Sequence, residues 1–241
     1  MASRAAPILG SVNVRAYIDG FNLYYGGKAL AEAAPGPDPP PSWKWLDLRA
    51  LVQSIADQRW RGRRPRVAHV TYCTARVVGD RRAVARQAAY LRALTLSGCV
   101  DLVEFGLFKE TYKRYPRATK DAKGRPILVG GGVPQMVGVS HREEKGSDVN
   151  LASRLLIDAL TGQMDAAIVV SNDSDLSLPV REARRLMPVG TVSPHPGHVH
   201  GSLRPDPVRG SGHWYHSLSM AELAAAQMPD PCEGIRRPTS W

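Results

Sequence analysis

Apolar and polar positions along the chain alternate between two periods, one typical of strands and one typical of helices. Residues 12–18 (VNVRAYI) alternate as a strand does, whereas residues 166–171 (AAIVVS) are apolar on both faces, as in a buried parallel strand. The predicted strands cover residues 12–18, 66–74, 100–108, 166–171 and 189–193. The predicted helices cover residues 21–33, 46–58, 81–97, 147–161, a segment ending at Met187, and 220–227. Strands that alternate with helices indicate an α/β fold with a mainly parallel sheet.

Helix ends carry recognisable capping residues. Asp80 is the expected N-cap of the third helix and Ser147 that of the fourth, while Gly98 and Gly162 are the expected stops. The spacing of Ser219 and Glu222 is that of a capping box before the last helix. The apolar stripes expected to face the core are Val84, Ala88, Leu91 and Leu94 in the third helix, and Val149, Ala152, Leu155 and Leu156 in the fourth.

The alternation is interrupted at residues 109–135, which are polar and basic and then rich in glycine. We interpret this segment as an inserted basic arm or hairpin within a domain that spans residues 12–193. Residues 194–241 are rich in proline and histidine and contain one short helix, so we treat them as a C-terminal extension.

Composition narrows the class of protein. The chain has 241 residues, a net charge of +10 and three cysteines without a C-x-x-C spacing, which argues against a disulfide scaffold and a cysteine-rich zinc module. No apolar run approaches the ~20 residues that span a bilayer, so we expect a cytoplasmic protein with no membrane partner. The positive charge favours a polyanionic partner such as a nucleic acid.

Aspartates fall where parallel strands are expected to end, which is the edge at which open α/β sheets form their sites. Asp19 ends the first strand, Asp173 and Asp175 follow the strand at 166–171, and Asp148 lies in the first turn of its helix. Asp165 precedes its strand and is therefore expected at the opposite edge of the sheet. Asp158 lies nearly three turns along the helix from Asp148, so it cannot share the same site.

Four converging carboxylates repel one another unless a cation neutralises them. Oxygen ligands without supporting histidine or cysteine indicate Mg²⁺ or Mn²⁺ rather than zinc. The alternative for each of these four residues is an ordinary helix cap or turn residue. Ser171 and Ser174 could hydrogen-bond a ligand or a phosphate oxygen, or serve the turn itself.

Two basic stretches are candidates for contact with RNA. Residues 59–92 contain ten arginines, including Arg82 and Arg86, against the single acid Asp80. In the arm, the candidate contacts are Tyr112, Lys113, Arg114 and Tyr115. Basic residues follow a phosphate backbone and aromatic rings stack on unpaired bases. The alternative is a solvated helix face and an arm with no role in binding.

Two other motifs are read as non-catalytic. His195, His198 and His200 have a spacing that suggests zinc, but they lie in a segment rich in proline and glycine and are interpreted as a polar loop. Phosphatases of the haloacid dehalogenase type also place a D-x-D motif after a strand, but they need a downstream lysine, and the last lysine of this chain is Lys145.

Three sequence blocks resemble the signature blocks of NYN domains, LabA-like members of the PIN-like nuclease superfamily. They are YIDGFNLYYG (17–26), EKGSDVNLASRLLIDAL (144–160) and AAIVVSNDSDLSLPV (166–180). The resemblance implies a PIN-like (Rossmann-like) three-layer sandwich and metal-dependent hydrolysis of RNA, single-stranded or structured. The family's acidic metal-binding positions fall on Asp19, Asp148, Asp173 and Asp175, with Asn22 beside them and Lys145 before the Gly-x-Asp turn.

The chain departs from the family pattern at two positions next to these acids. Asn172 stands where the family usually has glycine and Leu176 where it usually has phenylalanine. A β-carbon at position 172 could change the turn that aims Asp173. A catalytically weak or inactive RNA-binding or regulatory module is therefore the alternative to a ribonuclease. DNA as a substrate and a homodimer as the assembly are left open by the sequence.

Overall fold

The computed structural model describes residues 11–34, 42–117, 120, 124–125, 127–129, 132–134, 136–197, 200–206 and 210–239. Its centre is a seven-stranded sheet of order β6-β3-β2-β1-β7-β8-β9. The strands are β1 (Val12–Asp19), β2 (Pro65–Ala75), β3 (Leu102–Pro116), β6 (Met136–Lys145), β7 (Ala166–Val170), β8 (Val189–Ser193) and β9 (Trp214–Ser217). Neighbouring strands are parallel except β3 and β6, so the predicted mainly parallel sheet is confirmed.

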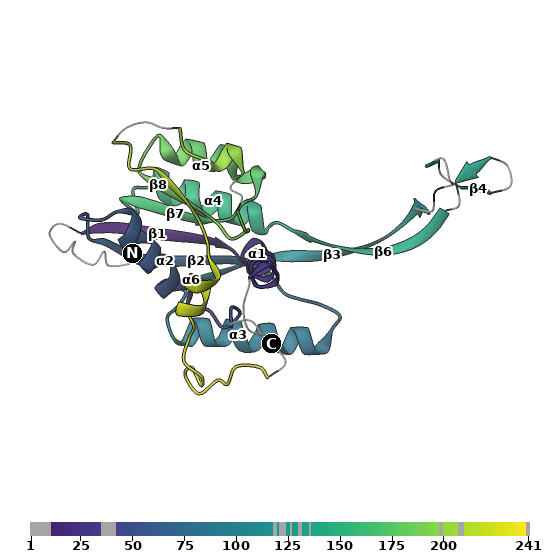
Figure 1. The fold of residues 1–241 in the computed structure, drawn as a ribbon, viewed down its shortest axis with the longest axis horizontal. Helices are drawn as coiled ribbons and strands as arrows, with labels where there is room; N and C mark the ends of the chain where they lie inside the picture. Colours follow the sequence, from purple (N-terminus) through teal and green to yellow (C-terminus); the bar gives the residue numbers. More distant parts are fainter. Residues whose placement is uncertain are drawn as a thin grey trace.

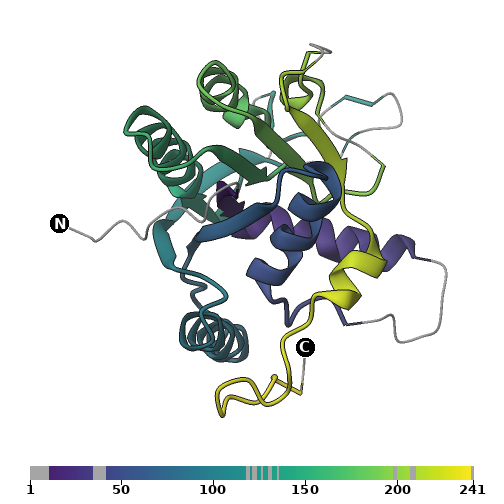
Figure 2. The ribbon, with the colours of Figure 1, turned by 90° about the vertical axis from the view of Figure 1, so that its left-hand side faces the viewer.

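Helices cover both faces of this sheet and form the predicted three-layer α/β sandwich (Figures 1 and 2). On one face lie α1 (Gly20–Ala33), α2 (Leu48–Arg59), α3 (Arg81–Leu96) and α6 (Met220–Ala225). On the other lie α4 (Ser147–Leu160) and α5 (Ser177–Arg184). Two short 3-10 helices, η1 (Ser174–Leu176) and η2 (Gly201–Leu203), complete the elements of the body. Each face has its own apolar core, with the fully buried β7 between the two.

Several predicted helix ends are confirmed. The Asp80 carboxylate accepts a hydrogen bond from the Arg82 N–H, and Ser219 and Glu222 form the reciprocal capping box. Gly98 and Gly162 both follow the last turn of their helices with positive φ, which glycine adopts without strain.

The cap and the buried stripe of α4 differ from the prediction. Ser147 is the first helical residue, and the N-cap is Gly146 with φ 93°. Of the predicted stripe, Leu155 is buried and Ala152 packs against the core, but Val149 is 67% exposed. Leu151 and Ala159 are buried as well, because α4 packs on the sheet through positions 151, 155 and 159.

The stripe of α3 is confirmed only in its second half. Leu91 and Leu94 are buried, but Val84 is 40% exposed and Ala88 is exposed as well. The first half of α3 contributes Ala83, Arg86 and Gln87 to the wall of a cleft rather than to the core. Tyr90, in the second half, joins the core instead.

The segment predicted as an arm is a two-stranded ribbon that projects from the body (Figure 1). Residues 107–116 of β3 pair antiparallel with residues 136–145 of β6, and β4 (Leu128–Val129) pairs with β5 (Val133–Pro134) toward the tip. The ribbon is longer than the predicted range of 109–135. In the projecting parts of β3 and β6, both faces of the ribbon carry polar residues. The sequence there lacks the alternation of apolar and polar positions that would mark where the strands begin and end.

Residues 194–241 contribute to the sheet. Strand β9 pairs parallel with β8, and Leu223 of α6 is buried in the core. Strand β9 was not predicted, because four residues are too short to show a clear period.

Cys73, Cys99 and Cys232 are buried and free, as expected without a disulfide framework. Across the described ranges, no helix is long and apolar enough to cross a membrane.

Candidate functional site: an acidic cavity at the sheet edge

The carboxyl ends of the strands meet beside β1, where the order of the sheet reverses. Strands β2 and β3 lie on one side of β1, and β7, β8 and β9 lie on the other. Open α/β sheets bind ligands in the crevice at such a switch point. A cavity of about 300 Å³ lies there, lined by Asp19, Phe21, Asn22, Tyr25, Glu144, Ser147, Asp148, Asp173 and His195.

Asp19 is both the N-cap of α1 and a wall of the cavity. Its Oδ1 accepts the Asn22 N–H at 2.9 Å, and its Oδ2 accepts the Ser171 hydroxyl at 2.9 Å. The residue is 4% exposed. Gly20 permits this tight turn, since a β-carbon there would lie 2.7 Å from the ring of Tyr72. Asp19 therefore serves as a helix cap and lines the cavity at the same time.

Asp173 is held by the loop that follows β7. Its N–H donates to the Ser171 hydroxyl at 3.1 Å, so this one hydroxyl links Asp19 and Asp173. The Asn22 side-chain oxygen accepts the Asn172 N–H at 2.9 Å and ties the loop to α1. Asn172 does not adopt positive φ, so its β-carbon fits without strain, and its own amide oxygen accepts the His200 N–H at 2.6 Å. Leu176 is buried in the core beneath.

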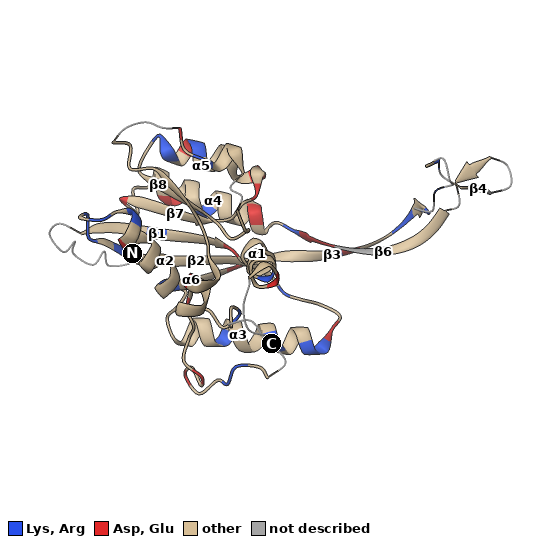
Figure 3. Ribbon diagram, in the orientation of Figure 1, with Lys and Arg blue, Asp and Glu red and all other residues tan. Residues whose placement is uncertain are grey.

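Asp148 lies in the first turn of α4, at the root of the arm. Strand β6 returns to the carboxyl edge and ends at Lys145, and the left-handed Gly146 turns the chain directly into the helix. Glu144 accepts the Ser147 N–H at 3.0 Å and so caps α4 from outside. Figure 3 shows acidic residues where the arm joins the body, at the start of α4.

Two carboxylates of the cavity, those of Asp19 and Asp148, have raised pKa values and form no ion pair with a described cationic side chain. Burial, together with Asp173 and Glu144, raises the pKa of Asp19 to about 6, against the hydrogen bonds from Asn22 and Ser171. Burial and four neighbouring acids, Asp19 foremost, raise the pKa of Asp148 to about 6. Among the described residues, none of the ion pairs formed by Lys, Arg or His involves Asp19, Asp148 or Asp173.

The donor set of the cavity fits a hard divalent cation. It consists of carboxylate oxygens that repel one another, which is the ligand type that Mg²⁺ and Mn²⁺ prefer. In the part of the chain that the structure describes, no three His, Cys, Asp or Glu side chains are drawn together tightly enough to hold an ion as they stand. Coordination would therefore require the side chains to move together or solvent to complete the ligand shell.

Three predicted site residues are placed beside the cavity rather than in its wall. Asp175 is exposed and donates its N–H to the Asp173 Oδ1 at 2.9 Å, and its charge contributes to the raised pKa of Asp148. The Lys145 ammonium pairs with Glu143 at 2.5 Å. Ser174 begins η1 and is half-buried.

The predicted RNA contacts lie outside the acidic cavity. Arg82 and Arg86 are on α3, where Arg86 lines a separate cleft. Tyr112, Lys113, Arg114 and Tyr115 are on the projecting part of β3, where Tyr112 is 75% exposed. These side chains could meet a long substrate beyond the cavity, but they cannot touch an atom bound inside it.

Four residues that line the cavity were not predicted from the sequence. No role was assigned to Glu144, although an acid four positions before Asp148 was a usable signal. Phe21 and Tyr25 lie one helical turn apart on α1, next to Asp19. His195 was assigned to a polar loop, yet it lines the cavity directly after β8, where burial lowers its pKa. His198 lies outside the described residues.

Three comparisons with known proteins place the chain among its relatives. The chain is 30% identical to 6-hydroxy-3-succinoylpyridine 3-monooxygenase HspA of Pseudomonas putida (strain DSM 28022 / S16), over 95% of this chain and 75% of that protein. A crystal structure of a protein of unknown function from Vibrio parahaemolyticus RIMD 2210633 is similar with a TM-score of 0.45 and 15% identity, covering 89% of this chain and 97% of that chain. The model of the NYN domain family matches residues 13–195. The chain therefore belongs to the NYN domain family, within the PIN-like nuclease superfamily.

Proposed function

We propose that this protein is a metal-dependent ribonuclease that hydrolyses RNA phosphodiester bonds at the acidic cavity. One observation carries the proposal: Asp19, Asp148 and Asp173 come from three separate segments and share one cavity with no described cationic partner. Uncompensated carboxylates are expected where a divalent cation supplies the missing charge. Membership of the NYN family supports a nuclease-like role.

Some residues of the cavity would bind the ion, and others would position the carboxylates that bind it. Asp19, Asp148 and Asp173 would hold Mg²⁺ or Mn²⁺, with Glu144 beside them. When bound, such an ion polarises a phosphate oxygen and makes water a stronger acid. The Ser171 hydroxyl donates to the Asp19 carboxylate and accepts the Asp173 backbone N–H, and Asn22 fixes the loop that carries Asp173. His195 is neutral near pH 7 because burial lowers its pKa, so it can accept a proton at the cavity wall.

RNA is the substrate that the charge of the chain favours. The net charge of +10 attracts a polyanion, and the arm presents Lys113 and Arg114 beside the exposed Tyr112. An acidic cavity within a basic chain suits the hydrolysis of a polyanion. A divalent cation bound by the carboxylates would make the charge of the cavity positive at the place where the phosphate must bind. DNA would be attracted by the same charge.

The name of the Pseudomonas putida relative supports a second candidate, oxygenation of a hydroxypyridine. A monooxygenase requires electrons from a cofactor or a redox-active metal. Four carboxylates and one imidazole, that of His195, line the cavity, and a set dominated by carboxylate oxygens prefers hard ions such as Mg²⁺ over redox metals held by imidazole or thiolate. The chemistry of the donors therefore favours hydrolysis as the first hypothesis.

Cleavage of labelled single-stranded RNA tests the proposal. We expect cleavage with Mg²⁺ or Mn²⁺, none with EDTA, and a loss of about 100- to 1000-fold in Asp173→Asn, since metal stabilisation of the transition state contributes several kcal/mol. Asp57→Asn, an exposed acid on α2, is the matched control and should cleave normally.

Two results would contradict the ribonuclease. Metal-independent RNA binding without cleavage would favour an inactive RNA-binding module. Oxygen uptake with 6-hydroxy-3-succinoylpyridine and a reductant, in the absence of RNA cleavage, would favour the monooxygenase.

A further inference from the structure

An aromatic cleft of about 300 Å³ lies between α1, β2 and α3, directly beside the acidic cavity. Its aromatic walls are Phe21, Tyr24, Tyr25, Tyr72 and Tyr90. We propose that this cleft binds one unpaired base of the RNA, next to the phosphate held at the acidic cavity. The inference rests on the proposed function and assigns it a base-binding subsite.

The two sites share a wall. Phe21 and Tyr25 line both the aromatic cleft and the acidic cavity, and Gly20 of the cleft directly follows Asp19. A base and its phosphate are joined through one sugar, so they occupy adjacent sites of different chemistry. An apolar cleft that abuts a phosphate-processing cavity matches that arrangement.

The upper rings of the cleft are exposed in a way that core aromatics are not. Tyr24 is 45% exposed and Tyr25 58%, and their rings meet edge-on, with centroids 5.5 Å apart and an interplanar angle of 83°. Tyr24 also packs against Trp43 at 5.4 Å, which holds its ring in place. Exposed, supported rings of this kind are the platforms on which unpaired bases stack.

Two polar side chains on the floor of the cleft, Tyr90 and Gln87, already form hydrogen bonds within the protein. The Tyr90 hydroxyl donates to the Leu46 carbonyl at 3.1 Å. The Gln87 amide donates to the Ala75 carbonyl and accepts from the Val77 N–H, both at 2.8 Å. With these groups engaged, the cleft would recognise the face of a base rather than its edge. We therefore expect weak preference among the four bases.

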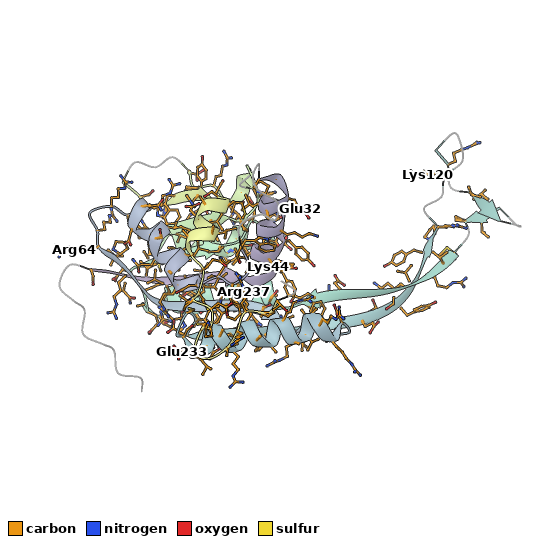
Figure 4. The ribbon with its side chains drawn as sticks, turned by 60° about the horizontal axis from the view of Figure 1, so that its bottom comes forward. Glu32, Lys44, Arg64, Lys120, Glu233 and Arg237 are labelled. Atoms are coloured by element: carbon orange, nitrogen blue, oxygen red, sulfur yellow. The ribbon has the colours of Figure 1, made fainter. Side chains whose placement is uncertain are left out.

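Two cationic side chains line the cleft, and one of them, Arg86, also pairs with the Asp80 carboxylate at 4.0 Å. Lys44 and Arg86 line it, and Figure 4 shows Lys44 between α1 and α3. Burial above all, and then the charges of Arg86 and Lys28, lower the pKa of Lys44. A nucleotide would bring the negative charge that relieves this repulsion.

Binding in EDTA tests the inference independently of cleavage. The probe is a short fluorescent oligouridylate, and its affinity is measured by fluorescence anisotropy for the full chain and for Tyr24→Ala. We expect Tyr24→Ala to weaken binding by about 5- to 20-fold, the lower part of the range for loss of one stacking platform. Tyr24→Phe keeps the ring and should restore binding, which separates stacking from a folding defect.

Tyr215→Ala is the matched control, because Tyr215 is 42% exposed on the distant edge strand β9. An abasic oligonucleotide of equal length should bind wild type more weakly than oligouridylate does. Its affinity should be the same for wild type and for Tyr24→Ala. The inference is overturned if the abasic chain binds as tightly as oligouridylate, or if Tyr24→Ala and Tyr215→Ala have equal effects.

It is also overturned if nicotinate, a small aromatic carboxylate, binds to the cleft and oligouridylate does not compete with it. Failure of cleavage with the Tyr24 effect intact would overturn the ribonuclease but not the base-binding cleft.

Discussion

Aspartates at the two edges of the sheet have opposite surroundings. At the amino edge, Asp158 accepts hydrogen bonds from the Arg15 guanidinium at 2.9 Å and the Tyr17 hydroxyl at 2.6 Å. Asp165, at the same edge, accepts the Asn13 N–H at 2.8 Å. At the carboxyl edge, Asp148 and Asp19 face other acids.

Helix α4 carries one aspartate of each kind, which makes the comparison direct. Asp158 sits beside a guanidinium, and together with burial it raises the pKa of Tyr17 well above its usual value. Asp148 has its pKa raised to about 6 by burial and by its acidic neighbours. The first arrangement stabilises the fold and the second costs stability, so the second is expected to be retained for function.

Removing the compensated aspartate should have the largest effect on folding. Asp158→Ala leaves the Arg15 charge and the Tyr17 hydroxyl without their acceptor in a partly buried place. We expect the free energy of unfolding to fall by about 2–3 kcal/mol. Urea denaturation followed by circular dichroism measures this. An unchanged midpoint would mean that the pair does not stabilise the fold.

Removing the uncompensated aspartate should act in the opposite direction. Asp148→Asn relieves repulsion and should raise the free energy of unfolding by about 1 kcal/mol at pH 7.5, after allowance for its half-exposed position. Urea denaturation of the metal-free protein measures this. Destabilisation at that pH would contradict the electrostatic account.

The pH dependence of this gain follows from the raised pKa. Below about pH 3 the Asp148 carboxyl is protonated in the folded and unfolded states alike, so the substitution changes no charge there. As pH rises from about 3 to 6, the unfolded state loses the proton first, and wild type loses stability relative to Asp148→Asn. The gain should therefore grow through this window and be complete above it. A gain that is equal at low and neutral pH would argue for a non-electrostatic cause.

The arm should show the smallest effect on folding and a separate effect on binding. Lys113 and Arg114 are exposed on the ribbon, so replacing both by alanine should change the free energy of unfolding by less than about 0.5 kcal/mol. If both contact phosphates of a single strand, the slope of log K against log salt should fall by about 1.4. Replacement of Arg181 on α5 and Arg185 at its C-cap provides the control. An unchanged slope would remove the arm from the binding surface.

Much of the fold could be predicted because local signals and tertiary packing agree. The apolar run of β7, the capping box at Ser219 and the Gly162 stop each depend on neighbouring residues alone. The burial of α4 could not be predicted from its apolar residues. Leu151 faces the sheet and Val149 does not, and that choice depends on how the helix is docked.

The site was predicted as far as the topology of a parallel sheet allows. The rule that strands end at one edge brought together Asp19, Asp148 and Asp173. It could not find Glu144, because that residue reaches the edge on the antiparallel strand β6, whose end depends on the pairing of the arm. It also could not separate Asp173 from Asp175, since the η1 turn directs only the first into the cavity.

Calorimetric titration of the full chain with Mn²⁺ at pH 7.5 tests the central claim, that uncompensated carboxylates at the carboxyl edge form a cation site. We expect wild type to bind Mn²⁺, Asp148→Asn to bind at least about tenfold more weakly, and Asp158→Ala to bind as wild type does while folded. Absence of binding by wild type, or equal binding by Asp148→Asn, would contradict the account.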